Sequence, residues 1–398
     1  MKRQLLHTPE GVRDIYNREC EKKLVLQDRL RKVLEHYGYH MIQTPTFEFF
    51  DIFGREVGTK PSKELYKFFD REGNTLVLRP DITPAIARAA SKYYMDETMP
   101  IRLCYVGNTY INYKRYQGHL KETTQLGAEL INDHSAMADA EMIAMAVDSL
   151  QESGLKDFQI SVGHAEFFLG LSEAAGLNEE QEEELRGLIN NKNFFGVEEF
   201  VSKLDIPEEL RQLFAMLNGF YDSAEEISAA KKLAAVYPRI LASIEYLEQL
   251  HRVMECYDID KYVSFELGLI SDYQYYTGII FSGYTFGSGE PIVKGGRYDK
   301  LLSRFGKEAP AVGFAIVVDQ LMAALSRQKI AIPVQNERQL VLYAKEQREK
   351  AVAFAREQRA QGASIELLQK EDRWSADDYE AYAQKHHIAK IIDMEVAK

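Results

Sequence analysis

The sequence predicts an α+β fold, in which a helical insertion interrupts a strand-rich body and a small α/β domain follows. Three observations lead to this prediction. Strand patterns recur over residues 39–164, with helical patterns between them, and again over residues 261–315. Residues 171–255 are almost wholly helical in pattern, and strands alternate with helices after residue 338. The chain has 398 residues, of which 45% are hydrophobic and 11% aromatic, enough for one large core and smaller satellites.

The first predicted element is an amphipathic helix over residues 21–38. Leu26, Leu30 and Leu34 recur at helical spacing with charged residues between them. Gly38 stands where a residue in the left-handed conformation commonly ends a helix. We therefore expect a helix that buries one apolar stripe and stops at this glycine.

The next segment, residues 39–53, is aromatic and β-branched, and Pro45 interrupts it. Because proline cannot donate to a strand ladder, this pattern indicates a strand at an edge or an interface. A further strand is expected over residues 74–81. Pro84 then suits the first turn of a helix rich in alanine.

A hairpin is expected over residues 101–131, and its tip is basic although the formal net charge of the chain is -12. The tip contains Lys114, Arg115, His119 and Lys121 with one acid, Glu122. Two interpretations stay open: a solvated hairpin tip, or a loop that holds a nucleotide. A helix over 133–154 and a strand over 158–164 complete this block.

Residues 171–255 are interpreted as an inserted helical subdomain, in which Asn178 and Gln181 have the spacing of a capping pair. Three strands are expected next, over residues 261–267, 275–286 and 291–299, and a helix is expected over residues 317–328.

A break at residues 331–337 precedes a strand, helix, strand, helix, strand pattern, which indicates a compact α/β unit with a partly parallel sheet. We therefore expect two domains, residues 1–330 and residues 331–398. The second has 11 basic and 12 acidic residues.

Composition narrows the class of protein. An excess of twelve acids repels a polyanion, so binding nucleic acid would require a concentrated basic face, and the sequence shows none. Cys20, Cys104 and Cys256 are far apart and outside metal-ligand spacing, so we expect no disulfide framework and no metal site. No stretch approaches the roughly 18 to 20 apolar residues of a membrane span, which favours a cytoplasmic protein.

Three polar clusters stand out as candidate binding residues. They are Arg79, Asp81 and Thr83 in LRPDIT, Gln125 and Glu129 in QLGAE, and Tyr275 and Tyr276 in YQYYTG. Each is weak evidence by itself, since carboxylates at strand ends and tyrosine pairs in sheets are more often structural.

Taken in order, with RLCYVG, GGRYD and PAVGFA, these stretches resemble the catalytic domain of class II histidyl-tRNA synthetases over about residues 8–326. The resemblance implies a class II aminoacyl-tRNA synthetase-like antiparallel sheet of about six strands flanked by helices, a dimer interface around residues 17–50, and a helical insertion at residues 171–255. It also implies a histidine site. Asp81 and Thr83 would meet the α-amino group, and Gln125, Glu129, Tyr275 and Tyr276 would surround the α-amino and imidazole ends.

The arginines that adenylation requires are missing. Joining a carboxylate to the α-phosphate of ATP moves negative charge onto the phosphates, which fixed guanidinium groups stabilise. The resemblance implies three such arginines, and their positions hold Ile111, Ser271 and Gln320. Loss of one preorganised charged donor costs about two to three orders of magnitude in rate, so we expect no catalytic residues and no cofactor.

A synthetase-like body with a histidine site, no adenylation arginines and a short C-terminal domain resembles the family of regulatory subunits of short-form ATP phosphoribosyltransferase. That resemblance implies a non-catalytic partner of the catalytic subunit, a homodimer within a hetero-octamer, histidine as feedback effector in histidine biosynthesis, no tRNA and no membrane. The alternatives are a divergent histidyl-tRNA synthetase-like ligase and a free-standing histidine sensor.

Overall fold

The computed structural model describes residues 6–54, 60–113, 119–221, 224–270, 275–334 and 338–394. The chain forms two compact units, one of residues 1–13 and 26–331 and one of residues 14–25 and 332–398. The domain limits expected from the sequence stay a prediction.

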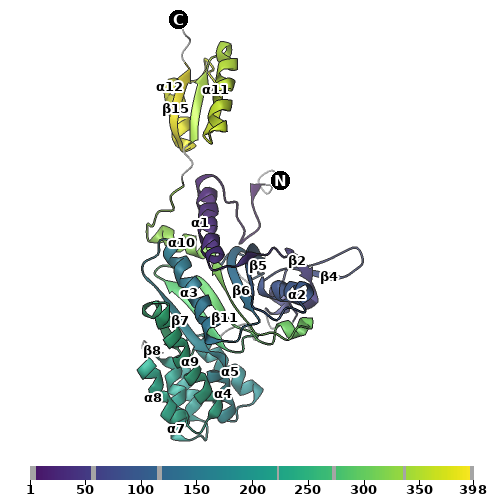
Figure 1. Ribbon diagram of the computed structural model, residues 1–398, viewed down its shortest axis with the longest axis vertical. Helices are drawn as coiled ribbons and strands as arrows, with labels where there is room; N and C mark the ends of the chain where they lie inside the picture. The colour runs from purple at the N-terminus through teal and green to yellow at the C-terminus, as the bar shows by residue number, and fades with distance from the viewer. Residues whose placement is uncertain are drawn as a thin grey trace. The chain divides into compact units, whose positions relative to one another are not determined.

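A mixed sheet forms the body of the larger unit. Its strands are β1 (His40–Met41), β5 (Ile101–Tyr110), β6 (Glu122–Ile131), β7 (Phe158–His164), β8 (Phe220–Tyr221), β9 (Val263–Glu266), β10 (Ile279–Thr285), β11 (Val293–Arg297) and β12 (Ala311–Val317). They lie in the order β1-β5-β6-β12-β11-β10-β7-β9-β8 (Figure 1).

Six neighbouring strands, from β5 to β7, are antiparallel throughout. The β1–β5 and β7–β9 pairs are parallel. Helices α3 (Ala136–Glu152) and α10 (Val318–Arg327) contact β6, β11 and β12. These features confirm the predicted α+β fold with an antiparallel sheet flanked by helices.

The N-terminal part follows the predicted order with shifted limits. Helix α1 (Asn17–His36) begins four residues before the expected start, buries Leu26, Leu30 and Leu34, and is followed by Gly38 with a φ of 82°. The expected strand over 39–53 is divided, because Pro45 separates β1 from β2 (Phe47–Phe49). Both pieces are edge strands, as expected.

A second, antiparallel sheet of three strands has the order β2-β4-β3, with β3 (Lys67–Phe69) and β4 (Thr75–Leu78). Helix α2 (Thr83–Tyr93) follows and has Pro84 in its first turn, as predicted. The expected strand over 74–81 ends at Leu78, so Asp81 lies in the turn before α2.

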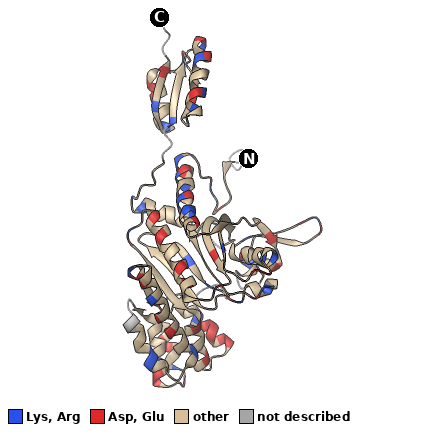
Figure 2. Ribbon diagram, in the orientation of Figure 1, with Lys and Arg blue, Asp and Glu red and all other residues tan. Residues whose placement is uncertain are grey.

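The insertion is helical, as predicted. Its helices are α4 (Ala165–Ala174), α5 (Glu179–Asn190), α6 (Phe194–Ser202), α7 (Glu208–Ala215), α8 (Ala224–Ala234) and α9 (Pro238–Cys256). Asn178 and Gln181 form the expected capping box, with the Asn178 side chain accepting from the Gln181 amide at 2.9 Å. Acidic residues gather on α5 (Figure 2). The short strand β8 was not predicted, because two residues carry no periodicity.

The smaller unit contains the predicted alternation. Strands β13 (Arg338–Tyr343), β14 (Ser364–Gln369) and β15 (Ile388–Met394) pair in parallel in the order β14-β13-β15. Val341 packs in a cluster with Ala355 of α11 (Arg348–Ala360), whereas Leu340 and Leu342 pack with Tyr379 of α12 (Ala376–Lys385). The two helices therefore cover opposite faces of β13. Basic and acidic residues are both present along α11 (Figure 2).

Candidate functional site

The six residues predicted to bind histidine line one pocket in the larger unit. They are Asp81, Thr83, Gln125, Glu129, Tyr275 and Tyr276. The cavity between their side chains is small, about 30 Å³, so an amino acid could enter only if these side chains moved apart. Segments nearly 200 residues apart in sequence therefore meet at one place, although the ligand stays a prediction.

Strand β6 supplies the floor of the pocket. Gln125 and Glu129 are four residues apart in a strand, so their side chains share one face. On the neighbouring strand β12, Gly313 lies opposite Glu129. A Cβ atom at Gly313 would lie 1.6 Å from Oε2 of Glu129, so glycine is required there to make room for the carboxyl group.

The turn before α2 supplies a second carboxyl group. Oδ1 of Asp81 accepts a hydrogen bond from the Ile82 amide at 2.8 Å, and the Tyr275 hydroxyl donates to Oδ2 at 3.0 Å. Thr83 donates its hydroxyl proton to Oε1 of Glu129 at 2.7 Å. The turn and the sheet are thus joined through the side chains of the pocket itself.

Both carboxyl groups are buried, and burial raises their pKa values. Asp81 is 5% exposed and Glu129 is 1% exposed. Burial raises the pKa of Glu129 to about 8, although hydrogen bonds from the Tyr298 and Thr83 hydroxyls lower it. Burial also raises the pKa of Asp81. A cationic ligand would stabilise the ionised carboxylates, so the pocket favours an ammonium or an imidazolium group.

Three tyrosines form an aromatic wall. The ring of Tyr275 lies 4.8 Å from the ring of Tyr276, tilted by 57°, and 5.8 Å from the ring of Tyr298 in an edge-to-face arrangement. Such a wall suits a flat, partly polar group such as imidazole, since the ring faces attract positive charge.

Two lining residues with polar side chains, Lys294 and Tyr298, were not predicted as site residues from the sequence. Tyr298 donates a hydrogen bond to Oε2 of Glu129. A signal was present, because Lys294, Gly296 and Tyr298 alternate along the KGGRYD stretch and therefore point to one side of the sheet. The sequence analysis used the GGRYD motif only for the resemblance, and did not use the alternation of side chains along the strand.

Arg79, which was grouped with Asp81 and Thr83 in the sequence, has a structural role. Its Nε donates to the carbonyl of Asn108 at 2.8 Å, and its Nη1 donates to the carbonyl of Thr44 at 2.9 Å. It is 6% exposed and is not among the residues that line the pocket. Arg79 therefore ties β5 to the segment before β2.

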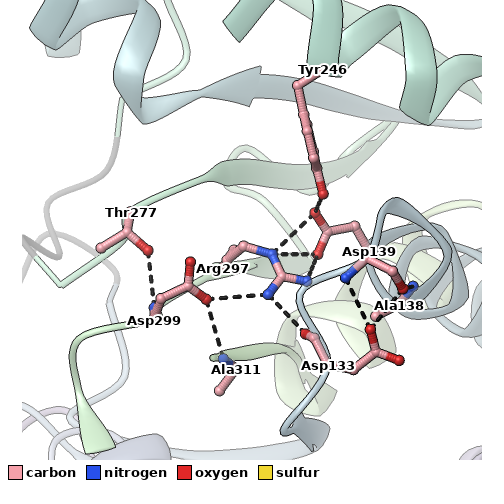
Figure 3. A network of polar contacts seen from close by, with 9 residues as sticks. Asp133, Ala138, Asp139, Tyr246, Thr277, Arg297, Asp299 and Ala311 are labelled. Atoms are coloured by element: carbon pink, nitrogen blue, oxygen red, sulfur yellow. Dashed lines mark hydrogen bonds and ion pairs between the residues drawn. The ribbon is translucent and has the colours of Figure 1, made fainter. Parts of the chain in front are cut away.

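Arg297, in the GGRYD motif, is also structural. It donates to the Asp139 carboxylate through Nε at 2.9 Å and Nη2 at 2.5 Å, and to the Asp133 carbonyl through Nη1 (Figure 3). The Tyr246 hydroxyl donates to the other carboxylate oxygen at 2.6 Å. Burial opposes the charge of Arg297, but Asp139 reverses this effect and raises its pKa. The network joins β11 to α3 and α9.

Comparison with known proteins identifies the family. Residues 11–321 match the family model described as histidyl-tRNA synthetase. The ATP phosphoribosyltransferase regulatory subunits of Acetivibrio thermocellus and Ruminiclostridium cellulolyticum are 39% and 40% identical to this chain, over 98% of this chain and 93% of each relative. The chain belongs to the family of ATP phosphoribosyltransferase regulatory subunits. A crystal structure titled ATP phosphoribosyltransferase regulatory subunit/histidyl-tRNA synthetase from Bacillus halodurans C superposes with a TM-score of 0.86 at 31% identity, covering 99% of both chains.

Two of the three positions where the synthetase family is expected to have an adenylation arginine lie among the described residues, Ile111 and Gln320. Ile111 continues the hairpin, with its amide donating to the Lys121 carbonyl at 2.9 Å. Gln320, on α10, donates to Glu290, whose other oxygen lies 2.6 Å from Nδ1 of His119. Ser271, Lys114 and Arg115 lie outside the described residues. Neither Ile111 nor Gln320 can provide a guanidinium group, so the likeness to histidyl-tRNA synthetases concerns the fold.

The part of the chain that the structure describes contains no helix long and apolar enough to cross a membrane. Among the same residues, no group of three or more potential ligands is arranged to hold a metal ion.

Proposed function

We propose that this chain is the non-catalytic regulatory subunit of a short-form ATP phosphoribosyltransferase, the enzyme of the first step of histidine biosynthesis. It enables the catalytic subunit and mediates feedback inhibition by histidine. The observation that carries the proposal is the composition of the pocket. Two buried carboxyl groups and three tyrosines line it, and no arginine is among its described lining residues.

The pocket suits free histidine. The α-ammonium group fits between Asp81 and Thr83, where a carboxylate and a hydroxyl can accept its protons. Gln125 and Glu129 lie on β6 and can accept hydrogen bonds from the imidazole ring, which the tyrosines would flank. The Oε1 atom of Gln125 is buried and has no hydrogen-bond partner, as expected for a group that a ligand satisfies.

The same pocket is poorly suited to adenylation. In-line transfer at the α-phosphate needs preorganised positive charge, and one such donor contributes about 3 to 4 kcal/mol to the transition state. The described positions that correspond to the family's arginines hold Ile111 and Gln320, which carry no charge. We therefore propose that this chain binds histidine without activating it.

Feedback inhibition needs only a difference in histidine affinity between two quaternary states. A coupling free energy of about 1 to 3 kcal/mol changes affinity by roughly 5- to 150-fold, and the same coupling acts on histidine binding when the catalytic subunit binds. No chemical step in this chain is required.

The proposed assembly is a homodimer within a hetero-octamer in the cytoplasm, with no tRNA bound. Large apolar side chains on β1 and β2 are exposed, including Met41, Phe47 and Phe49, which supports a dimer interface around residues 17–50. The C-terminal unit carries nearly equal numbers of acids and bases, so it offers little net attraction for tRNA phosphates.

The test is reconstitution with a purified short-form catalytic subunit. The two proteins should co-elute from a sizing column, and phosphoribosyl transfer to ATP should be faster with both proteins than with the catalytic subunit alone. Histidine should then inhibit the mixture. Unchanged turnover on mixing would contradict the proposal and favour a histidine sensor with another partner.

A further inference from the structure

The pocket has one basic side chain among its described lining residues, Lys294. It lies in β11, and it is exposed while the other residues of that strand are buried. The other four residues of β11 are buried, so Lys294 is the residue of this strand that solvent and a ligand can reach at the pocket.

The pairing of β11 fixes the position of Lys294. It lies opposite Ala315 of β12 and opposite Ser282 of β10. Ala315 in turn lies opposite Gly127 of β6, between Gln125 and Glu129. Lys294 is therefore two strands away from the carboxyl group of Glu129, on the same face of the sheet.

Lys294 also lines a neighbouring groove of about 270 Å³. That groove contains two more lysines, Lys60 and Lys192, and shares Tyr276 with the pocket. Lys192 forms an ion pair with Glu266 and does not line the pocket. The acid-lined pocket thus passes into a lysine-lined groove, with Lys294 at the boundary.

This polarity orients a zwitterion. A positive group of the amino acid would stabilise the ionised forms of Asp81 and Glu129, whereas the carboxylate of the amino acid would oppose their ionisation. Arg79 and Arg297 are engaged with backbone carbonyls and with Asp139, outside the pocket. A carboxylate at the pocket mouth would therefore meet the ammonium group of Lys294 first.

We infer that Lys294 binds the α-carboxylate of the amino acid and so selects free amino acids over the corresponding amines. The inference rests on the proposed function, since it concerns the ligand of the same site. In the synthetase family an arginine is expected at the position of Ser271. We infer that Lys294 of β11 makes the carboxylate contact in this chain instead.

The test compares histidine with histamine, which has the imidazole and the ammonium group but lacks the carboxylate. Calorimetry on the whole chain should show that histidine binds more tightly than histamine. Lys294→Met should weaken histidine binding about tenfold and leave histamine binding unchanged, because only the carboxylate contact is lost. Lys294→Arg should retain the preference for histidine.

Lys300→Met is the matched control. Lys300 is exposed, lies close to β11 in sequence and lines neither the pocket nor the groove, so its removal should change the affinity for neither ligand. Equal losses of affinity for histidine and histamine in Lys294→Met would overturn the inference. It would also be overturned if Lys60→Met, and not Lys294→Met, selectively lost affinity for histidine. Wild-type protein that binds neither ligand would instead contradict the proposed function.

Discussion

Replacement of Glu129 by glutamine is expected to raise the stability of the larger unit relative to wild type as pH increases from 6 to 8, and to weaken histidine binding. Glu129 is buried, and burial raises the pKa of its carboxyl group to about 8 from an ordinary value of 4.5. Between these two pH values the folded chain binds more protons at this residue than the unfolded chain does. The free energy of unfolding therefore falls as pH rises through this window.

The magnitude follows from the linkage relation. A single group of this kind lowers the free energy of unfolding by about 1.4 kcal/mol per pH unit inside the window, and less near its upper end. From pH 6 to pH 8 the wild-type chain should lose about 2 kcal/mol through Glu129. Glutamine does not titrate, so the stability of Glu129→Gln relative to wild type should rise by that amount.

The assay is urea unfolding of both proteins at pH 6, 7 and 8, followed by tyrosine fluorescence and circular dichroism. Only the change with pH is interpreted, because it is free of any fixed loss in the hydrogen bonds to Thr83 and Tyr298. Glu72→Gln is the control, since Glu72 is exposed in the turn between β3 and β4. A stability difference between Glu129→Gln and wild type that stays constant from pH 6 to pH 8 would refute the reasoning.

Three further predictions concern the pocket and its support. Tyr276→Ala and Glu129→Ala should each weaken histidine binding at least tenfold in calorimetry while co-elution with the catalytic subunit persists; wild-type affinity in both would place the histidine site elsewhere. Arg297→Met should lower the free energy of unfolding by about 3 to 5 kcal/mol, because Asp139 would be left buried without its partner, and a loss below 1 kcal/mol would argue against a charged pair. The isolated chain should catalyse no histidine-dependent exchange between pyrophosphate and ATP, and exchange above background would revive the synthetase alternative.

Local chemistry made much of the fold predictable. The capping pair Asn178 and Gln181 and the helix stop at Gly38 act through neighbours in sequence, so each was found from its spacing. The strand β8 was missed because its two residues acquire their conformation by pairing with β9, about 45 residues later. Pairing at that separation leaves no local pattern.

The site was predictable in part, for a similar reason. The motif order grouped all six proposed histidine-binding residues, and these residues line one pocket. Arg79 was grouped with them by sequence proximity, but its side chain turns to the carbonyls of Thr44 and Asn108. Lys294 alternates with Gly296 and Tyr298 in the sequence, but its position two strands from Glu129 follows only from the register of β11, β12 and β6.

The most direct test of the account is a histidine titration of phosphoribosyl transfer by the reconstituted complex, with the wild-type chain and with Glu129→Ala in parallel. We predict that both chains raise turnover of the catalytic subunit, that histidine inhibits the wild-type complex, and that the Glu129→Ala complex resists histidine at concentrations that fully inhibit the wild type. Equal inhibition of the two complexes would contradict the account, because the effector would then act outside this pocket.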